Sequence, residues 1–85
     1  MKVHVIVWRD GSIQIKKGEP EGAISIAEVA GFDVAVEAIK DTATLTEHGY
    51  VAPEVREAFE KGGDGVEALI RFQERFEKAL KEVHR

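Results

Sequence analysis

Hydrophobic residues recur at spacings of three and four near the end of the chain, which is typical of a helix with one apolar side. They are Val66, Leu69, Phe72, Phe76, Ala79 and Val83, with Ile70 and Leu80 widening the stripe. Asp64 can cap the first turn, and Glu67 can reach back to the Asp64 N–H, as in a capping box. The sequence therefore predicts a long amphipathic helix over 64–85, whose apolar side needs a partner surface of similar length.

The first residues follow a different period, in which apolar and polar side chains alternate. Two such runs, 2–8 and 13–16, are joined through Asp10 and Gly11, a strong signal for a β-hairpin. Alternation places one set of side chains on the core face: Val3, Val5, Val7, Ile13 and Ile15. The opposite face then displays Lys2, His4, Ile6, Trp8, Gln14 and Lys16.

The stretch 23–30 admits two interpretations. Residues 23–27 alternate weakly and predict a third strand, which would support the hairpin, because a two-stranded ribbon is marginal alone. Ser25 and Glu28 could instead form a capping box that opens a single helical turn before Gly31. We favour the strand.

Two further helices are expected in the middle of the chain. The first runs from an N-cap at Asp33 to about Glu47. His48 then lies at the C-terminal, negative end of the helix dipole, and Gly49 follows it. Threonines at 42, 44 and 46 weaken its last turn and leave a strand open there. The second begins with Pro53 in the first helical position and stops at Gly62.

These elements predict one α+β domain over residues 1–85. An N-terminal hairpin with a third strand forms a small antiparallel sheet, and three helices pack on one face of it. The last helix is the long amphipathic one.

Composition adds few constraints to this picture. With 44% hydrophobic and 33% charged residues, the 85-residue chain is expected to fold, and without cysteine it must do so without disulfides. Neither a signal peptide nor a membrane-spanning run is recognisable, which predicts a cytoplasmic protein with no membrane partner. The net charge is −4, but basic residues prevail over 1–18 and acidic residues over 19–67.

No residue set carries a catalytic, cofactor or metal signature. The carboxylates follow the polar sides of the expected helices, and the three histidines, His4, His48 and His84, have no metal-ligand spacing. The glycine-rich segment 62–65 lacks the Lys-Ser/Thr pair of a phosphate loop. We therefore expect neither an enzyme nor a cofactor.

The remaining class is a small protein-interaction module that binds another protein or itself. Homodimerisation would use the C-terminal stripe, whose phenylalanines offer large anchors; the same stripe could instead cover the chain's own sheet. The candidate partner-binding residues are Trp8, Ile6, His4, Lys16, Leu69, Phe72 and Phe76. One alternative is nucleic-acid binding through the basic hairpin face, which the acidic net charge disfavours. Another is an acidic decoy that binds a basic partner through residues 19–67.

Overall fold

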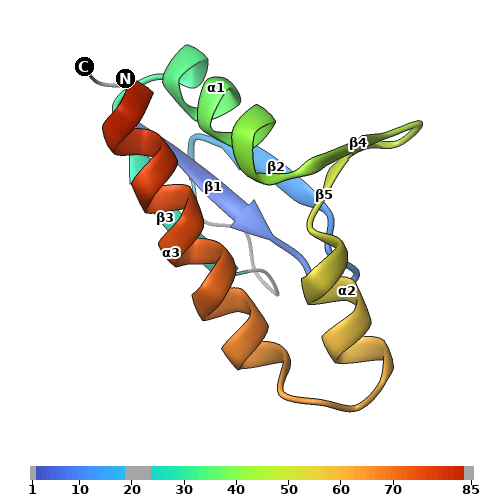
Figure 1. Ribbon diagram of the computed structural model, residues 1–85. Helices are drawn as coiled ribbons and strands as arrows, with labels where there is room; N and C mark the ends of the chain where they lie inside the picture. The colour runs from blue at the N-terminus through green and yellow to red at the C-terminus, as the bar shows by residue number, and fades with distance from the viewer. Residues whose placement is uncertain (1, 19–23, 84–85) are drawn as a thin grey trace.

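The architecture is α+β, with a small antiparallel sheet and three helices, the last of them long (Figure 1). It is seen in a computed structural model that describes residues 2–18 and 24–83. The strands are β1 (Val3–Val7), β2 (Ile13–Lys16), β3 (Ile24–Val29), β4 (Thr44–Thr46) and β5 (Gly49–Val51). The helices are α1 (Phe32–Thr42), α2 (Pro53–Glu60) and α3 (Gly65–Val83).

The predicted hairpin is confirmed. β1 pairs antiparallel with β2, with Val7 opposite Ile13 and His4 opposite Lys16. The Trp8 N–H donates to the Ser12 carbonyl at 2.9 Å, and Gly11 takes a positive φ of 86° between them. Only glycine adopts such a φ without strain, which explains why Asp-Gly is a good turn signal here.

The stretch 24–29 is a strand, and the alternative single helical turn is wrong. β3 pairs antiparallel with β1 on the side away from β2, so β1 is the central strand of three. The register shifts between Val5 and Ile6, where β3 carries one extra residue, Ile26. The α3 side chain Gln73 donates to the Ile26 carbonyl at 2.8 Å, which satisfies a backbone group at this irregularity. Residue 23, the predicted start of the strand, lies outside the described residues.

The middle of the chain differs most from expectation. α1 begins after an N-cap at Gly31 that makes no side-chain bond, so the predicted cap, Asp33, lies in the first turn instead. It ends at Thr42 rather than Glu47, because the threonine-rich stretch forms β4, which pairs with β5 in a second hairpin. His48 lies in the turn of that hairpin, followed by Gly49 with a φ of 110°.

The last two helices begin where they were expected. Pro53 occupies the first turn of α2, and Gly62 follows that helix with a φ of 71°. The Glu67 N–H donates to the Asp64 carboxylate at 3.0 Å, which confirms the Asp64 cap of α3. The reciprocal half of the capping box is absent among the described contacts, since the Glu67 side chain pairs with Arg71 one turn later.

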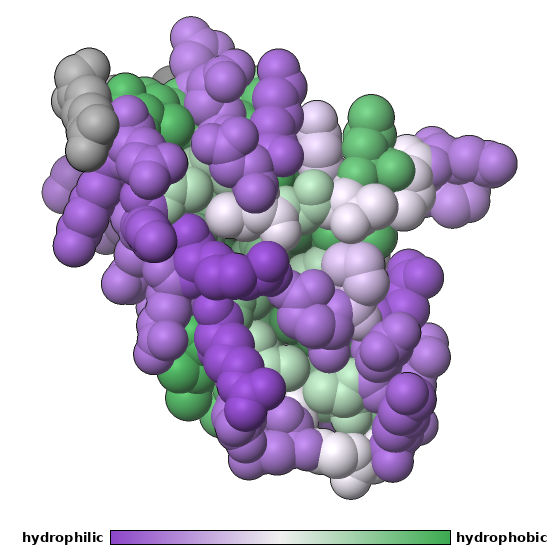
Figure 2. Space-filling model, in the orientation of Figure 1, coloured by the Kyte–Doolittle hydropathy of each residue, from purple (hydrophilic) through white to green (hydrophobic). Residues whose placement is uncertain are grey.

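The core joins the sheet to the helices. Val3, Val5 and Val7 of β1 pack in one cluster with Phe72 and Phe76 of α3, together with alanines of α1 and Val55 of α2. α1 and α3 lie side by side in front of the sheet in Figure 1, and α2 packs mainly against α3. The outer surface seen from this side is mainly hydrophilic (Figure 2). No helix in the described part of the chain is long and apolar enough to cross a bilayer.

Candidate functional site

The side chains of β1 and β2 that point away from this core form a second surface, which we call the Trp8 face. It consists of His4, Ile6 and Trp8 on β1 and just after it, with Gln14 and Lys16 on β2. None of these five residues belongs to the core cluster of the described residues. The face therefore contains all four candidate partner-binding residues of the N-terminal hairpin, namely His4, Ile6, Trp8 and Lys16.

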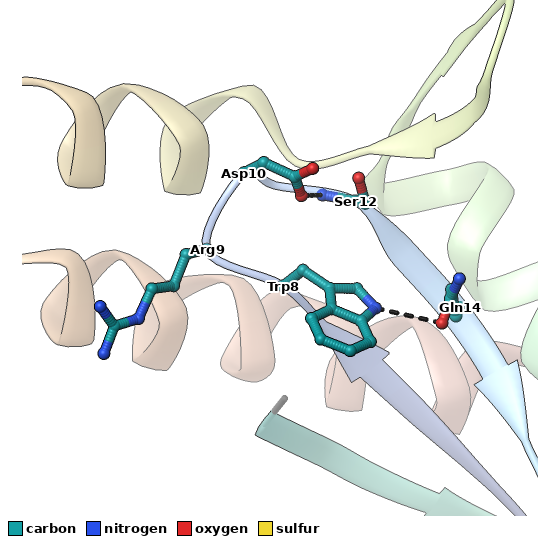
Figure 3. A pocket seen from close by; sticks show the side chains of 5 residues that line it. All are labelled: Trp8, Arg9, Asp10, Ser12 and Gln14. Atoms are coloured by element: carbon teal, nitrogen blue, oxygen red, sulfur yellow. Dashed lines mark hydrogen bonds between the residues drawn. The ribbon is translucent and has the colours of Figure 1, made fainter. Parts of the chain in front are cut away.

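Trp8 is the largest side chain of this face, and its orientation is fixed. It is partly exposed, and its indole N–H donates to the Gln14 side-chain oxygen at 3.1 Å (Figure 3). Because a tryptophan has one hydrogen-bond donor and no acceptor, this bond meets the polar requirement of the indole within the chain. What remains available is the flat apolar surface of the ring, held in one position.

A hollow of about 380 Å³ lies beside the indole, lined by Trp8, Arg9, Asp10, Ser12 and Gln14. The Arg9 side chain extends away from the indole in Figure 3, and its guanidinium carbon lies 5.8 Å from the centre of the Phe59 ring. The hollow is therefore an open, mixed surface in which the indole is the main apolar element.

Asp10 stabilises the turn at the edge of this hollow. Its carboxylate accepts a hydrogen bond from the Ser12 N–H at 2.9 Å. Hydrogen bonds from the side chain and the amide of Ser12, and then the positive charge of Arg56, hold the pKa of Asp10 below its usual value. The carboxylate is thus stabilised in its charged form and fixes the loop, which is a structural role.

The other predicted residues of the face differ in accessibility. His4 is partly buried, and its Nδ1 lies 3.0 Å from the hydroxyl oxygen of Ser25 on β3. Lys16 is exposed at the end of β2. Nearby, the Lys2 ammonium lies 3.5 Å from the Glu28 carboxylate, so part of the basic character of this face is balanced locally.

Ile6 is not displayed, contrary to the prediction. It is 0% exposed although it lies outside the core cluster. The register explains this, because the central strand places Gln14 and Ser25 on either side of Ile6, with His4 and Trp8 two residues before and after it. Ile6 supports the Trp8 face from below and offers no contact area.

Leu69, Phe72 and Phe76 are buried, whereas a dimer through the C-terminal stripe would need them exposed on the monomer. They are 5%, 0% and 0% exposed and pack against the chain's own sheet and α1. The structure thus separates them from the Trp8 face, and it follows the alternative in which the stripe covers the sheet. Val66 and Ile70, which the same pattern placed on the buried side, are 60% and 49% exposed.

A third surface was not anticipated from the sequence. A groove of about 270 Å³ runs between β2, α1 and the β4–β5 hairpin, and we call it the β2 groove. Its lining consists of Ile13, Ile15, Phe32, Val36, Ile39 and Tyr50. The sequence contained one signal of this groove. Phe32 follows Gly31 and precedes the expected helix, so the predicted elements gave this large apolar side chain no place in the core.

The described residues contain no cluster of metal-binding side chains. No group of three or more His, Cys, Asp or Glu side chains within residues 2–18 and 24–83 is placed to hold a metal ion. The hollow brings together the hydroxyl of Ser12, the amide of Gln14 and the carboxylate of Asp10, and the hydrogen bonds from Ser12 to Asp10 hold the turn.

No protein-family model, curated protein or solved structure matches this chain. The function is therefore argued from the residues of the chain itself.

Proposed function

We propose that the protein is a small non-enzymatic interaction module that binds a protein partner through the Trp8 face. In this proposal the three helices cover one face of the sheet, and the opposite face is left for the partner. The observation that carries it is the partly exposed indole of Trp8, whose orientation is fixed by the bond to Gln14. A rigid aromatic side chain offers a large contact area at little cost in conformational entropy, which is why tryptophan is enriched at the energetic centres of interfaces.

The surroundings of Trp8 also suit a protein partner. Gln14 and Lys16 are exposed next to the indole, and Ser12 lies in the adjacent turn. An apolar centre with a polar, exposed surround is the usual composition of a protein interface. The turn itself is held to α2, since Arg56 donates to the Asp10 carbonyl and Ala52 donates to the Gly11 carbonyl, both at 2.8 Å. The surface therefore needs little ordering when it binds.

Site-specific photo-crosslinking tests this proposal. A photoreactive amino acid replaces Lys16 on the Trp8 face in one variant and the exposed Glu77 of α3 in a matched control. We expect one defined protein adduct from position 16 in cells of the source organism, lost when Trp8→Ala is added, and no such adduct from position 77. Equal labelling from both positions, or adducts that survive Trp8→Ala, would contradict the proposal.

Nucleic-acid binding is the second candidate, because Lys2, Arg9, Lys16 and Lys17 come from the same hairpin as the indole. The pairing of Lys2 with Glu28 and the contact of Arg9 with Phe59 weaken it. Trp8 is the only tryptophan of the chain, so its fluorescence reports directly on this surface. A salt-sensitive change in emission on titration with single-stranded oligonucleotides would favour nucleic acid over a protein partner.

A further inference from the structure

The β2 groove gathers apolar side chains from three parts of the chain. α1 contributes Phe32, Val36 and Ile39, at spacings of four and three along one side of the helix. Phe32 is 58% exposed. Leu45 of β4 lies opposite Tyr50 of β5, which lines the groove, and Leu45 is 66% exposed. Directly opposed residues of two strands share a face, so Leu45 extends the apolar surface outward along the hairpin that projects past the sheet in Figure 1.

Exposed apolar side chains gathered beside a groove mark a binding surface. In Figure 2, hydrophobic atoms reach the surface at the base of the β4–β5 hairpin, in a mainly hydrophilic surround. The groove has a volume of about 270 Å³, and its lining is apolar apart from the Tyr50 hydroxyl. Its occupant must therefore present apolar side chains.

The backbone beside the groove excludes a strand as this occupant. Ser12 forms an antiparallel bridge with Val51, and the Ala52 N–H donates to the Gly11 carbonyl at 2.8 Å, so β5 lies against the start of β2. A strand added there would leave backbone groups unpaired, at a cost in free energy. A helix satisfies its own backbone hydrogen bonds and fills a groove with side chains at spacings of three and four. The geometry therefore favours a helix.

Negative charge borders the groove on α1 and on the β4–β5 hairpin. The exposed charged residues of α1 are Asp33, Glu37, Lys40 and Asp41, and Glu47 is exposed in the hairpin turn. Glu37 and Lys40 pair with each other at 3.6 Å. Asp33, Asp41 and Glu47 form no ion pair with another described residue. Basic side chains of an occupant can pair with these carboxylates.

From this geometry and charge we propose that the β2 groove binds an amphipathic helix of a protein partner, with apolar side chains in the groove and Lys or Arg beside them. Charge complementarity selects this occupant. Two-fold pairing of two copies through the groove would bring their acidic α1 helices together, and an anionic lipid surface would meet the same carboxylates. The groove gives part of the acidic middle of the chain a defined role, which is separate from that of the Trp8 face.

Two synthetic peptides test the class of partner. One is an amphipathic helix of about 14 residues, roughly 20 Å long, with Leu at spacings of three and four and Lys elsewhere. The other has Glu in place of Lys. Fluorescence anisotropy should show binding of the labelled Lys peptide, weaker at high salt, and no binding of the Glu peptide. Absence of binding, equal binding of both, or a bound Lys peptide whose circular dichroism is not helical would overturn the proposal.

A matched pair of variants places the peptide on the groove. Phe32→Ala removes the exposed anchor of α1 and should weaken binding of the Lys peptide about tenfold or more. Val66→Ala changes a residue of α3 that is 60% exposed and does not line the groove, and it should change the affinity less than about twofold. Equal effects would show that the peptide binds elsewhere.

A second pair separates local charge from net charge. Asp33→Asn with Asp41→Asn removes two negative charges beside the groove and should weaken binding several-fold. Glu57→Gln with Glu60→Gln removes two from exposed positions of α2, which does not line the groove, and should have little effect. If both double variants weakened binding equally, the peptide would respond to net charge alone and the proposal would fail.

Light scattering and Trp8→Ala complete the test. Circular dichroism first verifies that each variant is folded. A dimer that Phe32→Ala dissociates would assign the groove to a second copy and overturn the proposal. Trp8→Ala should leave binding of the Lys peptide unchanged, so the result for the groove is independent of whether the Trp8 face binds a partner.

Discussion

Gly11 shows how a single residue positions the Trp8 face. Besides its positive φ, it lies so close to the start of α2 that an added Cβ would be 2.8 Å from the Ala52 carbonyl oxygen. The sequence predicted the first requirement, because Asp-Gly is a turn signal. It did not predict the second, since nothing in residues 9–12 indicates that residues forty positions later pack against the turn.

Gly11→Ala should therefore destabilise the protein by about 1–3 kcal/mol, the cost of a strained backbone at one position. Chemical denaturation followed by circular dichroism measures this change. Gly18→Ala is the matched control, because an added Cβ at Gly18 meets nothing within 4 Å, and its effect should stay within about 0.5 kcal/mol. Equal effects of the two substitutions would show that the turn is not held against α2 as described.

The same limit of local signals explains Ile6 and Trp8. Alternation assigned both to the face opposite the core, and the register agrees. Alternation does not indicate how far neighbouring strands enclose a side chain. The burial of Ile6 depends on the pairing of β3 with β1, and the sequence left open whether residues 23–30 form a strand at all. Trp8, one residue past the end of β1, has fewer neighbours and remains partly exposed.

At the scale of elements, α3 determines most of the core. Phe72 and Phe76 are both fully buried, and their ring centroids are 6.4 Å apart. The period of the helix predicted its extent and its apolar side. It made that side too wide, because Val66 and Ile70 lie beyond the part of the stripe that meets the sheet.

Phe76→Ala should consequently lower the free energy of unfolding by about 3–5 kcal/mol, as expected for a large cavity in a small core. Ile70→Ala on the same helix removes a side chain that is 49% exposed and should cost less than about 1 kcal/mol. Urea unfolding of the two variants measures both values. A small effect of Phe76→Ala would mean that the side chain is not in the monomer core and would revive the C-terminal helix as an interface.

The β4–β5 hairpin is the element that the sequence described least well. Thr44 and Thr46 suggested a strand, but the apolar pattern of residues 35–45 favoured continuing the helix. Three-residue strands contain too few positions for alternation to be recognised. The unanticipated β2 groove follows from this, because its far end is formed by Tyr50 of β5.

For the whole molecule, the sequence predicted the class of fold and the order of most elements, whereas both surfaces depend on contacts between distant segments. One cluster contains buried residues of β1, β3, α1, α2 and α3. We therefore expect residues 1–85 to unfold as one domain, since no segment among the described residues has a core of its own.

Coincident transitions would verify this expectation. Trp8 fluorescence reports on the sheet and its turn, while far-ultraviolet circular dichroism reports mainly on the helices, and both should give the same midpoint and slope in urea. Separate midpoints would indicate that the hairpin and the helices unfold independently. The comparison needs a protein concentration at which the oligomeric state is constant.

The attachment of the first turn to the start of α2 also bears on synthesis. The strands of the hairpin leave the ribosome before the helices that complete their packing. Ala52 and Arg56, which bond to the hairpin turn, and Phe72 and Phe76, which pack with the valines of β1, are made later. A two-stranded ribbon is marginal alone, and contacts between residues far apart in sequence form late. The nascent N-terminal half therefore exposes its valine-rich strands until α3 is complete, and such transiently exposed strands are the segments of a growing chain most prone to aggregate.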